Sequence, residues 1–414
     1  MGVEHIAVIV IYFPTTSETF IVNQINGLIE SGKQISLYAY NKVDNDVIHD
    51  SLLTHDLLNK VRYFVHPSKS KILRFTGFLG WTFSNIRRIK WKLFFRSLNV
   101  FKYGKDAYTL KLFYEAQWFL VNHNIDLIHA HFGMCGNRIA YLKSMNILPE
   151  SVKLITTFHG FDIEPGQAEY YKDKYKYLIH ETAAYIANTP YLKSLIEEIN
   201  ERKKPVHVLP VGLDTDFFKK TEPKKENPYF DLLFCGKLIP LKGPDLAIKI
   251  VEALHKRGYK QVRLQMVGKG RMMDQLQEQA RQIEIPDAII FHGALDQTAL
   301  KFLFESADVF LMPGRHDPKT GRAETQGLVI QEAQAMEVPV VVSDVGGMKY
   351  GMIPDETGIL VPSEQIETFV ETLIVLINDP QLRANMGENG RTLVESNYRN
   401  KILNEKLVRI YDEC

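Results

Sequence analysis

Residues 321–344 read GRAETQGLVIQEAQAMEVPVVVSD, a polar loop followed by a helix-length segment and a short β-branched run. Gly327 separates the loop from the helix-length segment, and the run at 338–343 carries no charged side chain. A strand that is apolar on both faces and is joined to a helix is typical of a parallel sheet covered by helices on both sides. The stretch therefore predicts one unit of an α/β domain.

The same alternation continues in both directions along the chain. Strand-length apolar runs occur at HIAVIVIYF (5–13), IDLIHAHF (125–132), VKLITTFHG (152–160), DLLFCGKL (231–238), VRLQMVGKG (262–270) and AIIFHGAL (288–295). So many units exceed one open sheet, and the sequence predicts two doubly wound, Rossmann-like domains that face each other across a cleft. A stretch rich in Lys, Glu and Pro at 219–228 has the composition of a linker.

Length and composition narrow the class of protein. The 414 residues are too many for one hydrophobic core, and 45% hydrophobic with 24% charged residues describe an ordinary globular protein. A net charge of +1 argues against a protein-wide field for nucleic acid. The three cysteines lie far apart and form no C-x-x-C pair, which predicts a reducing compartment and no structural zinc.

Two acids flank the glycine of the opening stretch. A helix that begins after Gly327 leaves the backbone N–H groups of Leu328 and Val329 free, which is an arrangement suited to a diphosphate. Glu332 lies about one turn into the helix and can accept hydrogen bonds from ribose hydroxyls. Glu324, on the loop, can reach sugar hydroxyls on the other side. Solvated acids near a helix start are the alternative interpretation.

Cations are predicted at another strand end of the second half. In LLFCGKLIPLKG the strand ends at Gly236, and Lys237 and Lys242 flank the turn that follows. Two positive side chains that face an anion site from the same sheet are what a departing diphosphate requires. The alternative is a pair of solvated loop lysines.

Further strand ends fall on the same predicted edge. Gly268 ends one run, and His292 and Gly293 end the next, so we expect all three near the nucleotide. Backbone groups at His292 and Gly293 are placed to contact a base. Met273 stands where a dinucleotide-binding fingerprint needs its third glycine, so the fingerprint itself is absent.

Histidines mark the strand ends of the first half. TTFHGFD places His159 at a predicted strand end over the cleft, where Gly160 permits close approach. His129 and His131 resemble a metal pair, but no third ligand is spaced to complete a site, so we favour structural roles. The acids of DTD (214–216) are expected to cap a turn, and no metal site is predicted.

One segment is both basic and aromatic. From His66 to Lys105 the chain has ten Lys and Arg residues, no acid and nine interleaved Phe, Trp and Tyr residues. This composition is typical of a surface for anionic lipid, here the inner membrane, or for a lipid-phosphate acceptor. A helical hairpin packed on the first domain, with its lysines in water, is an equal alternative. Nucleic acid is not expected, because no recognised nucleic-acid-binding module accompanies the segment.

Glu324 and Glu332, with seven residues between them, form an E-x7-E motif that resembles the motif of the retaining glycosyltransferases of family 4. The resemblance covers nearly the whole chain. It includes SETFIVNQINGLIESGKQISLYAY (17–40), HAHFG, TTFHGFD, VLPVGLDTDFF, GKLIPLKG, VGKG and ETGILVP. SETF and TFHGFD are most similar to bacterial enzymes that build exopolysaccharide, capsule or O-antigen. The resemblance implies the GT-B fold of two Rossmann-like domains.

The resemblance also implies a division of labour between the domains. Residues 1–208 are expected to bind the acceptor and residues 209–394 the nucleotide-sugar donor, with a terminal helix at 395–414 crossing back onto the first domain. Lys237 stands where the family often has arginine, so a point charge replaces a forked phosphate contact.

Site roles follow from the same resemblance. Glu324 would contact donor-sugar hydroxyls and Glu332 the ribose. Lys237 and Lys242 would neutralise the diphosphate. His159 would contact the sugar near the reacting centre, and the backbone from Gly327 to Val329 would hold the distal phosphate.

The function implied is transfer of a hexose from a nucleoside diphosphate sugar, with UDP favoured over GDP, to a hydroxyl of a glycan or lipid-linked glycan, with retention. The nucleotide sugar is a co-substrate, and neither a metal nor another cofactor is expected. The expected location is the cytoplasm, with residues 66–105 offering contact with the inner face of the membrane. Two alternatives are a sugar-nucleotide epimerase or phosphorylase on the same fold, and a non-catalytic polysaccharide-sensing or scaffold protein.

Overall fold

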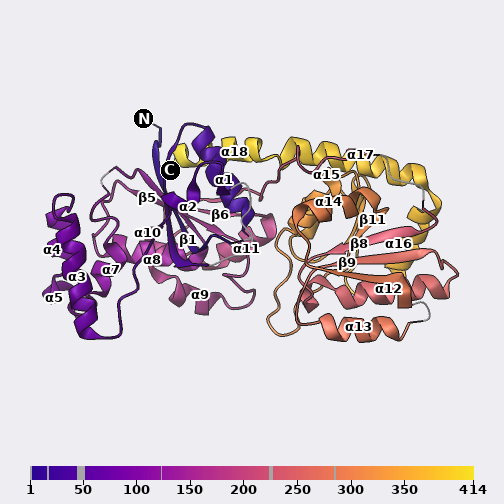
Figure 1. The fold of residues 1–414 in the computed structure, drawn as a ribbon, viewed down its shortest axis with the longest axis horizontal. Helices are drawn as coiled ribbons and strands as arrows, with labels where there is room; N and C mark the ends of the chain where they lie inside the picture. Colours follow the sequence, from indigo (N-terminus) through magenta and orange to yellow (C-terminus); the bar gives the residue numbers. More distant parts are fainter. Residues whose placement is uncertain (1, 16–17, 44–51, 123, 223–226, 284–285) are drawn as a thin grey trace.

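The computed structural model describes residues 2–15, 18–43, 52–122, 124–222, 227–283 and 286–414. Its strands form two separate sheets, one of seven strands and one of six (Figure 1). The prediction of two doubly wound α/β domains is therefore confirmed. Residues 223–226 of the expected linker lie outside the described residues, and the exact domain limits stay a prediction.

The first sheet has the order β3-β2-β1-β4-β5-β6-β7, with every neighbouring pair parallel. Its strands are β1 (His5–Phe13), β2 (Gln34–Lys42), β3 (Arg62–Tyr63), β4 (Leu127–His131), β5 (Lys153–Phe158), β6 (Ala184–Ala187) and β7 (Val206–Val208). The helices of this half are α1 (Thr19–Glu30), α2 (Leu57–Lys60), α3 (Lys71–Asn85), α4 (Trp91–Ser97), α5 (Val100–Tyr103), α6 (Lys105–Tyr108), α7 (Lys111–Ala116), α8 (Gly133–Ser144), α9 (Ala168–Lys174), α10 (Lys176–Glu181) and α11 (Pro190–Ile199).

The second sheet has the order β10-β9-β8-β11-β12-β13 and is also parallel throughout. Its strands are β8 (Phe230–Cys235), β9 (Val262–Val267), β10 (Ile289–Gly293), β11 (Val309–Met312), β12 (Val340–Ser343) and β13 (Gly358–Val361). The α-helices are α12 (Pro244–Lys256), α13 (Met273–Arg281), α14 (Gln297–Ser306), α15 (Leu328–Ala335), α16 (Ile366–Asn378), α17 (Pro380–Asn397) and α18 (Asn400–Glu413). Short 3-10 turns form η2 (Pro240–Lys242), η3 (Pro286–Ala288) and η4 (Met348–Gly351).

Each sheet reverses its strand order beside its first strand. β1 lies between β2 and β4, and β8 lies between β9 and β11. The connections leaving the carboxyl ends of the two strands at such a reversal run to opposite faces of the sheet, which leaves a crevice between them. A ligand site is therefore expected beyond β1 and β4 in one domain and beyond β8 and β11 in the other.

The last helix belongs to the core of the first domain although it ends the chain. Leu407 and Tyr411 of α18 are 0% and 1% exposed and pack in one cluster with residues of β1 and α1. Figure 1 shows α17 and α18 following one side of the molecule from the second domain to the first. α18 therefore completes the packing of the first domain.

The crossing is made by two helices rather than by one helix over 395–414. α17 ends at Asn397 and α18 begins at Asn400. Between them the backbone pairs with Leu213, whose N–H donates to Tyr398 O at 3.0 Å and whose carbonyl accepts from Asn400 N at 3.2 Å. These hydrogen bonds to a second chain segment replace helical ones, so the helix is interrupted where both interdomain connections run side by side.

A glycine at the end of β9 tests the close packing of strand ends in the second domain. Gly268 has φ +138°, and a Cβ built on it would lie 1.9 Å from the carbonyl oxygen of Gly236. Gly268→Ala should therefore lower the free energy of unfolding through both the strained backbone and this clash. The clash should add about 1–3 kcal/mol to the loss that the backbone strain causes. The control is Gly258→Ala, because Gly258 also has a positive φ, +96°, but open space around it. Equal urea midpoints for the two variants would contradict this packing.

Candidate active site

The loop at 321–327 lies between the two domains and is bonded to both. Thr325 O accepts a hydrogen bond from Thr189 Oγ1 at 2.7 Å, and Thr325 Oγ1 donates to His159 O at 3.3 Å. Gln326 exchanges two hydrogen bonds with the backbone of Val211, each 2.8 Å long. The carboxyl end of β11 is thereby held against the carboxyl ends of β5 and β6, and both reversal points open onto the same interdomain space.

Gly160 serves this contact between domains. Its φ is +101°, and a Cβ built on it would lie 2.2 Å from Thr325 Cγ2. The sequence predicts that a glycine here permits close approach, and what approaches is the loop of the second domain.

Glu324 is bound tightly at the end of this loop. Its Oε1 accepts hydrogen bonds from the backbone N–H groups of Thr325 and Gly327, both at 3.1 Å, and from Gln326 N at 3.4 Å. Its Oε2 pairs with Lys242 Nζ, and the two side chains are only 15% and 16% exposed. Burial alone would raise the pKa of Glu324, but Lys242 and these N–H groups lower it below its usual value. The carboxylate is therefore charged at neutral pH.

The two predicted cations have different surroundings. Lys242 ends η2, and its side chain lies over Gly236, with the nearest atoms 3.7 Å from a Cβ built there. Lys237 is exposed, and its charge acts on Glu18, just before α1 in the first domain, where burial raises the carboxyl pKa and Thr15 and Lys237 lower it in part. The structure thus pairs Lys242 with Glu324. Lys237 stays exposed, with its charge acting on Glu18 of the first domain.

The start of α15 has the predicted form of an anion site. Gly327 is the N-cap residue, in the left-handed conformation with φ +71°. The backbone N–H groups of Leu328 and Val329 have no hydrogen-bond partner among the described residues. Glu332 follows about one turn later in α15. Burial raises its pKa to about 7, and the charge of Lys242 opposes this shift only in part. Both acids of the motif therefore lie within the electrostatic reach of one lysine.

The remaining residues expected near the nucleotide also meet at one edge of the second sheet. Gly268 N donates to Gly293 O at 2.7 Å, so the ends of β9 and β10 are joined. The side chain of His292 turns along the sheet, with its Nε2 2.7 Å from Gln265 Oε1, and burial lowers its pKa. The hydrogen bond to Gln265 holds the His292 side chain against the sheet, and contact of the His292 and Gly293 backbone with a base stays a prediction.

Three neighbouring histidines, His129, His131 and His159, lie on the first-domain side of the candidate site. His159 Nε2 lies 3.1 Å from His131 Nδ1, and the rings of His131 and His129 lie 4.4 Å apart. His129 makes 2.7 Å hydrogen bonds to Tyr411 Oη of α18 and to Thr157 Oγ1. Burial lowers the pKa of His129 and of His159 to about 3. All three imidazoles are therefore neutral at physiological pH.

Asp162 is a site residue that the sequence reasoning missed. It is 2% exposed, and its carboxylate accepts hydrogen bonds from the backbone N–H groups of Gly133 at 2.8 Å, Gly160 at 3.0 Å and His159 at 3.1 Å. It joins the loop after β5 to the start of α8 and so fixes the backbone that carries His159. Its place at the end of TTFHGFD was the available signal.

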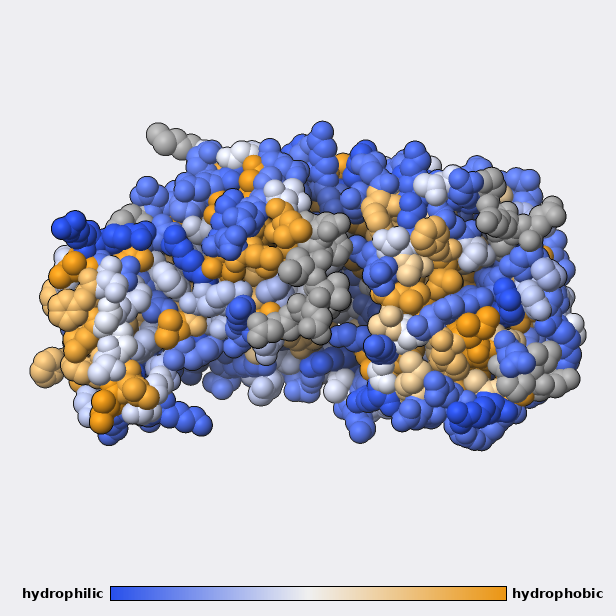
Figure 2. Space-filling model, in the orientation of Figure 1, coloured by the Kyte–Doolittle hydropathy of each residue, from blue (hydrophilic) through white to orange (hydrophobic). Residues whose placement is uncertain are grey.

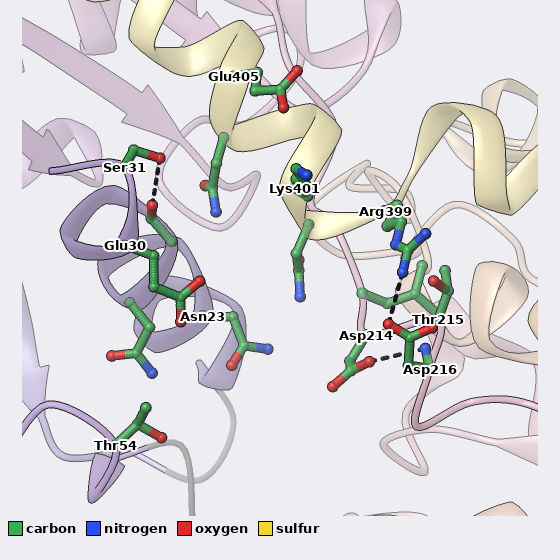
Figure 3. A pocket seen from close by; sticks show the side chains of 15 residues that line it. Asn23, Glu30, Ser31, Thr54, Asp214, Thr215, Asp216, Arg399, Lys401 and Glu405 are labelled. Carbon is green, nitrogen blue, oxygen red and sulfur yellow. Dashed lines mark hydrogen bonds and ion pairs between the residues drawn. The ribbon is translucent and has the colours of Figure 1, made fainter.

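Two hollows lie beside the first turn of α18. The smaller one is lined by His131, His159 and Asn188, together with Asn400 and Asn404. Asn400 and Asn404 also line a larger hollow of about 610 Å³ between α1 and residues 213–216 (Figure 3). The lining of the larger hollow contains neither Glu324 nor Lys242, so it is separate from that ion pair.

Asp214 caps the turn at 214–217, as the sequence predicts, whereas Asp216 has another role. Asp214 Oδ1 accepts from the backbone N–H groups of Asp216 at 2.9 Å and Phe217 at 3.0 Å, and Asp216 pairs with Arg399 (Figure 3). Among the described residues, no group of three or more His, Cys, Asp or Glu side chains is placed to hold a metal ion.

Comparison with known proteins identifies the class. Residues 17–217 match the model described as Glycosyltransferase Family 4, and residues 214–393 match the model described as Glycosyl transferases group 1. Between them the two models span the chain from 17 to 393, so the protein is a glycosyltransferase with a family 4 region followed by a group 1 region.

Two relatives show the range of similarity to curated proteins. WcaL of Escherichia coli K12, named as a colanic acid biosynthesis glycosyltransferase, is 24% identical over 400 residues, which cover 96% of this chain and 97% of that protein. A GDP-mannose-dependent mannosyltransferase of Corynebacterium glutamicum is 32% identical over 213 residues, 49% of this chain and 55% of that protein.

Solved structures confirm the GT-B fold. HepE from Anabaena, in complex with UDP, has a TM-score of 0.72 at 14% identity and covers 99% of this chain and 100% of its own. Sucrose-phosphate synthase from Thermosynechococcus elongatus has a TM-score of 0.69 at 20% identity, with 99% and 98% coverage.

The raised pKa of Glu332 predicts how stability depends on pH. Because the folded pKa, about 7, lies above the ordinary value of 4.5, the folded protein binds more protons than the unfolded one between these values. Ionisation of Glu332 therefore lowers the free energy of unfolding progressively as the pH rises from 4.5 to about 7, and the loss is constant at higher pH. Glu332→Gln should gain on the order of 1–3 kcal/mol relative to the parent between pH 5 and pH 8.

Urea unfolding of the ligand-free protein at both pH values measures this difference. Glu371→Gln, an exposed glutamate on α16, is the control and should show no such gain. A pH-independent difference between Glu332→Gln and the parent would show that Glu332 is ionised throughout the range.

Proposed function

We propose that this glycosyltransferase moves a hexose from a nucleoside diphosphate sugar to a hydroxyl of a glycan or lipid-linked glycan, with retention and without a metal ion. The observation that carries the proposal is the Lys242–Glu324 ion pair at the open start of α15, with Glu332 beneath it. The product would be part of a bacterial surface polysaccharide, as the name of WcaL suggests. We place the reaction in the cytoplasm.

Donor binding would exchange the partners of this ion pair. A diphosphate entering at the N–H groups of Leu328 and Val329 offers Lys242 a stronger, doubly charged partner. Glu324, released from Lys242 but still held by the backbone, is then free to accept hydrogen bonds from sugar hydroxyls. Glu332 lies on the same helix, one turn on, where a ribose bonded to that diphosphate would reach it.

The transfer step needs little proton chemistry from the protein. The bond between the anomeric carbon and the phosphate oxygen breaks, the bond to the acceptor oxygen forms on the same face, and the departing phosphate oxygen takes the acceptor proton. Neutral His159 does not supply that proton. Its Nε2 is bound to His131, so Nδ1 is the ring nitrogen left to contact the sugar. Lys242, with Lys237 closing the opening, stabilises the charge that develops on the diphosphate.

UDP is the favoured nucleotide. The similarly folded HepE is solved with UDP and with UDP-glucose, whereas the relative from Corynebacterium glutamicum is named for GDP-mannose. A thermal-shift panel separates the two: a donor at a hundred times its dissociation constant adds about 2.7 kcal/mol of stability. The expected result is stabilisation by UDP-sugars and not by GDP-sugars. Stabilisation by no nucleotide sugar in the panel would remove the basis of the proposal.

Replacing the central cation tests the chemical role. Lys242→Ala should lower turnover at saturating donor on the order of a hundredfold or more, because the charge on the departing diphosphate loses its nearest cation. Lys256→Ala is the control, since Lys256 is 66% exposed on the adjacent α12 and pairs with Glu252 of the same helix. Transfer by Lys242→Ala at the parent rate, with an unchanged urea midpoint, would rule out this role.

Two other functions give different results in one assay. An epimerase or phosphorylase would convert the donor without a glycan acceptor, and a sensing or scaffold protein would bind the donor and convert nothing. Incubating the protein with donor alone and then with an acceptor panel, followed by analysis of the sugar products, distinguishes all three.

A further inference from the structure

The structure divides the large apolar side chains of 66–105 into a buried set and an exposed set. Phe78 and Phe94 are buried and pack with Phe113 of α7, at ring-centroid distances of 4.8 Å for Phe78 and 5.9 Å for Phe94. This set forms part of the core of the first domain. For these residues the sequence-based alternative, a helical hairpin packed on the first domain, is correct. It does not explain the second set.

The second set forms an apolar stripe on α3 that borders the buried face, since the ring centroids of Phe75 and Phe78 lie 6.0 Å apart. Its members recur at three- and four-residue spacing and are exposed: Ile72 by 76%, Phe75 by 53%, Leu79 by 36%, Phe83 by 70% and Ile86 by 47%. That spacing marks one face of a helix and is normally the face turned to a core. Here Phe78 packs into the core while the stripe beside it lies in water, so the apolar surface of α3 is wider than the core covers.

Neighbouring helices extend this stripe into a patch. Trp91 and Phe95 of α4 are 41% and 64% exposed, and Phe101 of α5 is fully exposed. Figure 2 shows hydrophobic surface at this end of the molecule, where Figure 1 places α3, α4 and α5, away from the second domain. We call the α3 stripe with Trp91, Phe95 and Phe101 the end patch. Scattered exposed apolar residues need no explanation, but a contiguous group of this kind marks an interaction surface.

The segment that carries the end patch has positive charges and no negative ones. No acid occurs from 66 to 105, and the exposed cations there include Lys71, Arg87, Lys92 and Lys102. The whole chain has a net charge of only +1, so the charge is concentrated at this end. Apolar side chains among lysines and arginines match the boundary between acyl chains and anionic headgroups.

We propose that the end patch docks on the surface of an anionic lipid bilayer, with the α3 stripe, Trp91, Phe95 and Phe101 inserted below the headgroups. A second copy of the chain fits less well, because a two-fold contact would bring two patches of the same strong positive charge together. Among the described residues no helix is long and apolar enough to cross the bilayer, so attachment through this patch would be to one surface. The inference rests on the surface alone and goes beyond the transfer reaction.

Flotation with lipid vesicles tests the docking. The full chain should float with vesicles of phosphatidylcholine that contain about 30% phosphatidylglycerol, an anionic lipid, and far less with vesicles of pure phosphatidylcholine. Raising the salt concentration should weaken the binding, because headgroup attraction is screened. Leu79→Gln with Phe83→Gln should lower the fraction bound tenfold or more, and Arg87→Gln with Lys92→Gln should remove the preference for anionic vesicles.

The controls use the same residue types elsewhere on the surface. Phe302 of α14 is 64% exposed, close to the value for Phe83, and Phe302→Gln should leave flotation unchanged. Lys256→Gln with Arg281→Gln removes two exposed cations of the second domain in the same way. Urea midpoints equal to that of the parent show that each variant is folded.

Several outcomes would overturn the proposal. These are absence of flotation with anionic vesicles, equal flotation with both vesicle types, and an equal loss with Phe302→Gln. A dimer in solution that Leu79→Gln with Phe83→Gln dissociates would assign the end patch to self-association instead. Transfer of sugar to a water-soluble acceptor is measured in parallel, so failure of docking and failure of the proposed reaction are distinguished.

Discussion

The ion pair between Lys242 and Glu324 is the interaction on which the second-domain side of the candidate site depends. Both side chains are mostly buried, so neither charge has enough water to be stable alone. The lysine comes from the turn after β8 and the glutamate from the loop before α15, so the pair spans the point where the strand order of the second sheet reverses. Any ligand that enters must supply a new partner for the ammonium group, which favours an anion such as a diphosphate.

The loop that carries Glu324 is also the main polar contact between the domains. Thr325 and Gln326 follow Glu324 directly; Thr325 is bonded to residues 159 and 189 of the first domain, and Gln326 is bonded to Val211 in the connection between the domains. A change in the angle between the domains must break these hydrogen bonds, and the same backbone holds the carboxylate of Glu324. The geometry of the donor site and the separation of the domains are therefore linked through one short segment.

The last helix, α18, helps to position the histidines on the first-domain side of the site. Tyr411 of α18 is bonded to His129, whose ring lies against His131, and His131 is bonded to His159. The low pKa values follow from burial, and neutral rings can be stacked without charge repulsion. The sequence-based choice of structural roles for His129 and His131 fits this arrangement, and the structure adds that their position decides which nitrogen of His159 faces the cleft.

The sequence by itself determined the two parallel sheets, because strands apolar on both faces, such as 338–343, are stable only between helices. It also determined the candidate residues at strand ends, because parallel strands bring their carboxyl ends to one edge. Only the tertiary structure decided that Lys242 rather than Lys237 meets the acids, that Gly160 admits Thr325, and which face of α3 stays in water. These depend on contacts between segments far apart in the chain, and local periodicity contains no information about which partner a buried charge or an apolar face will find.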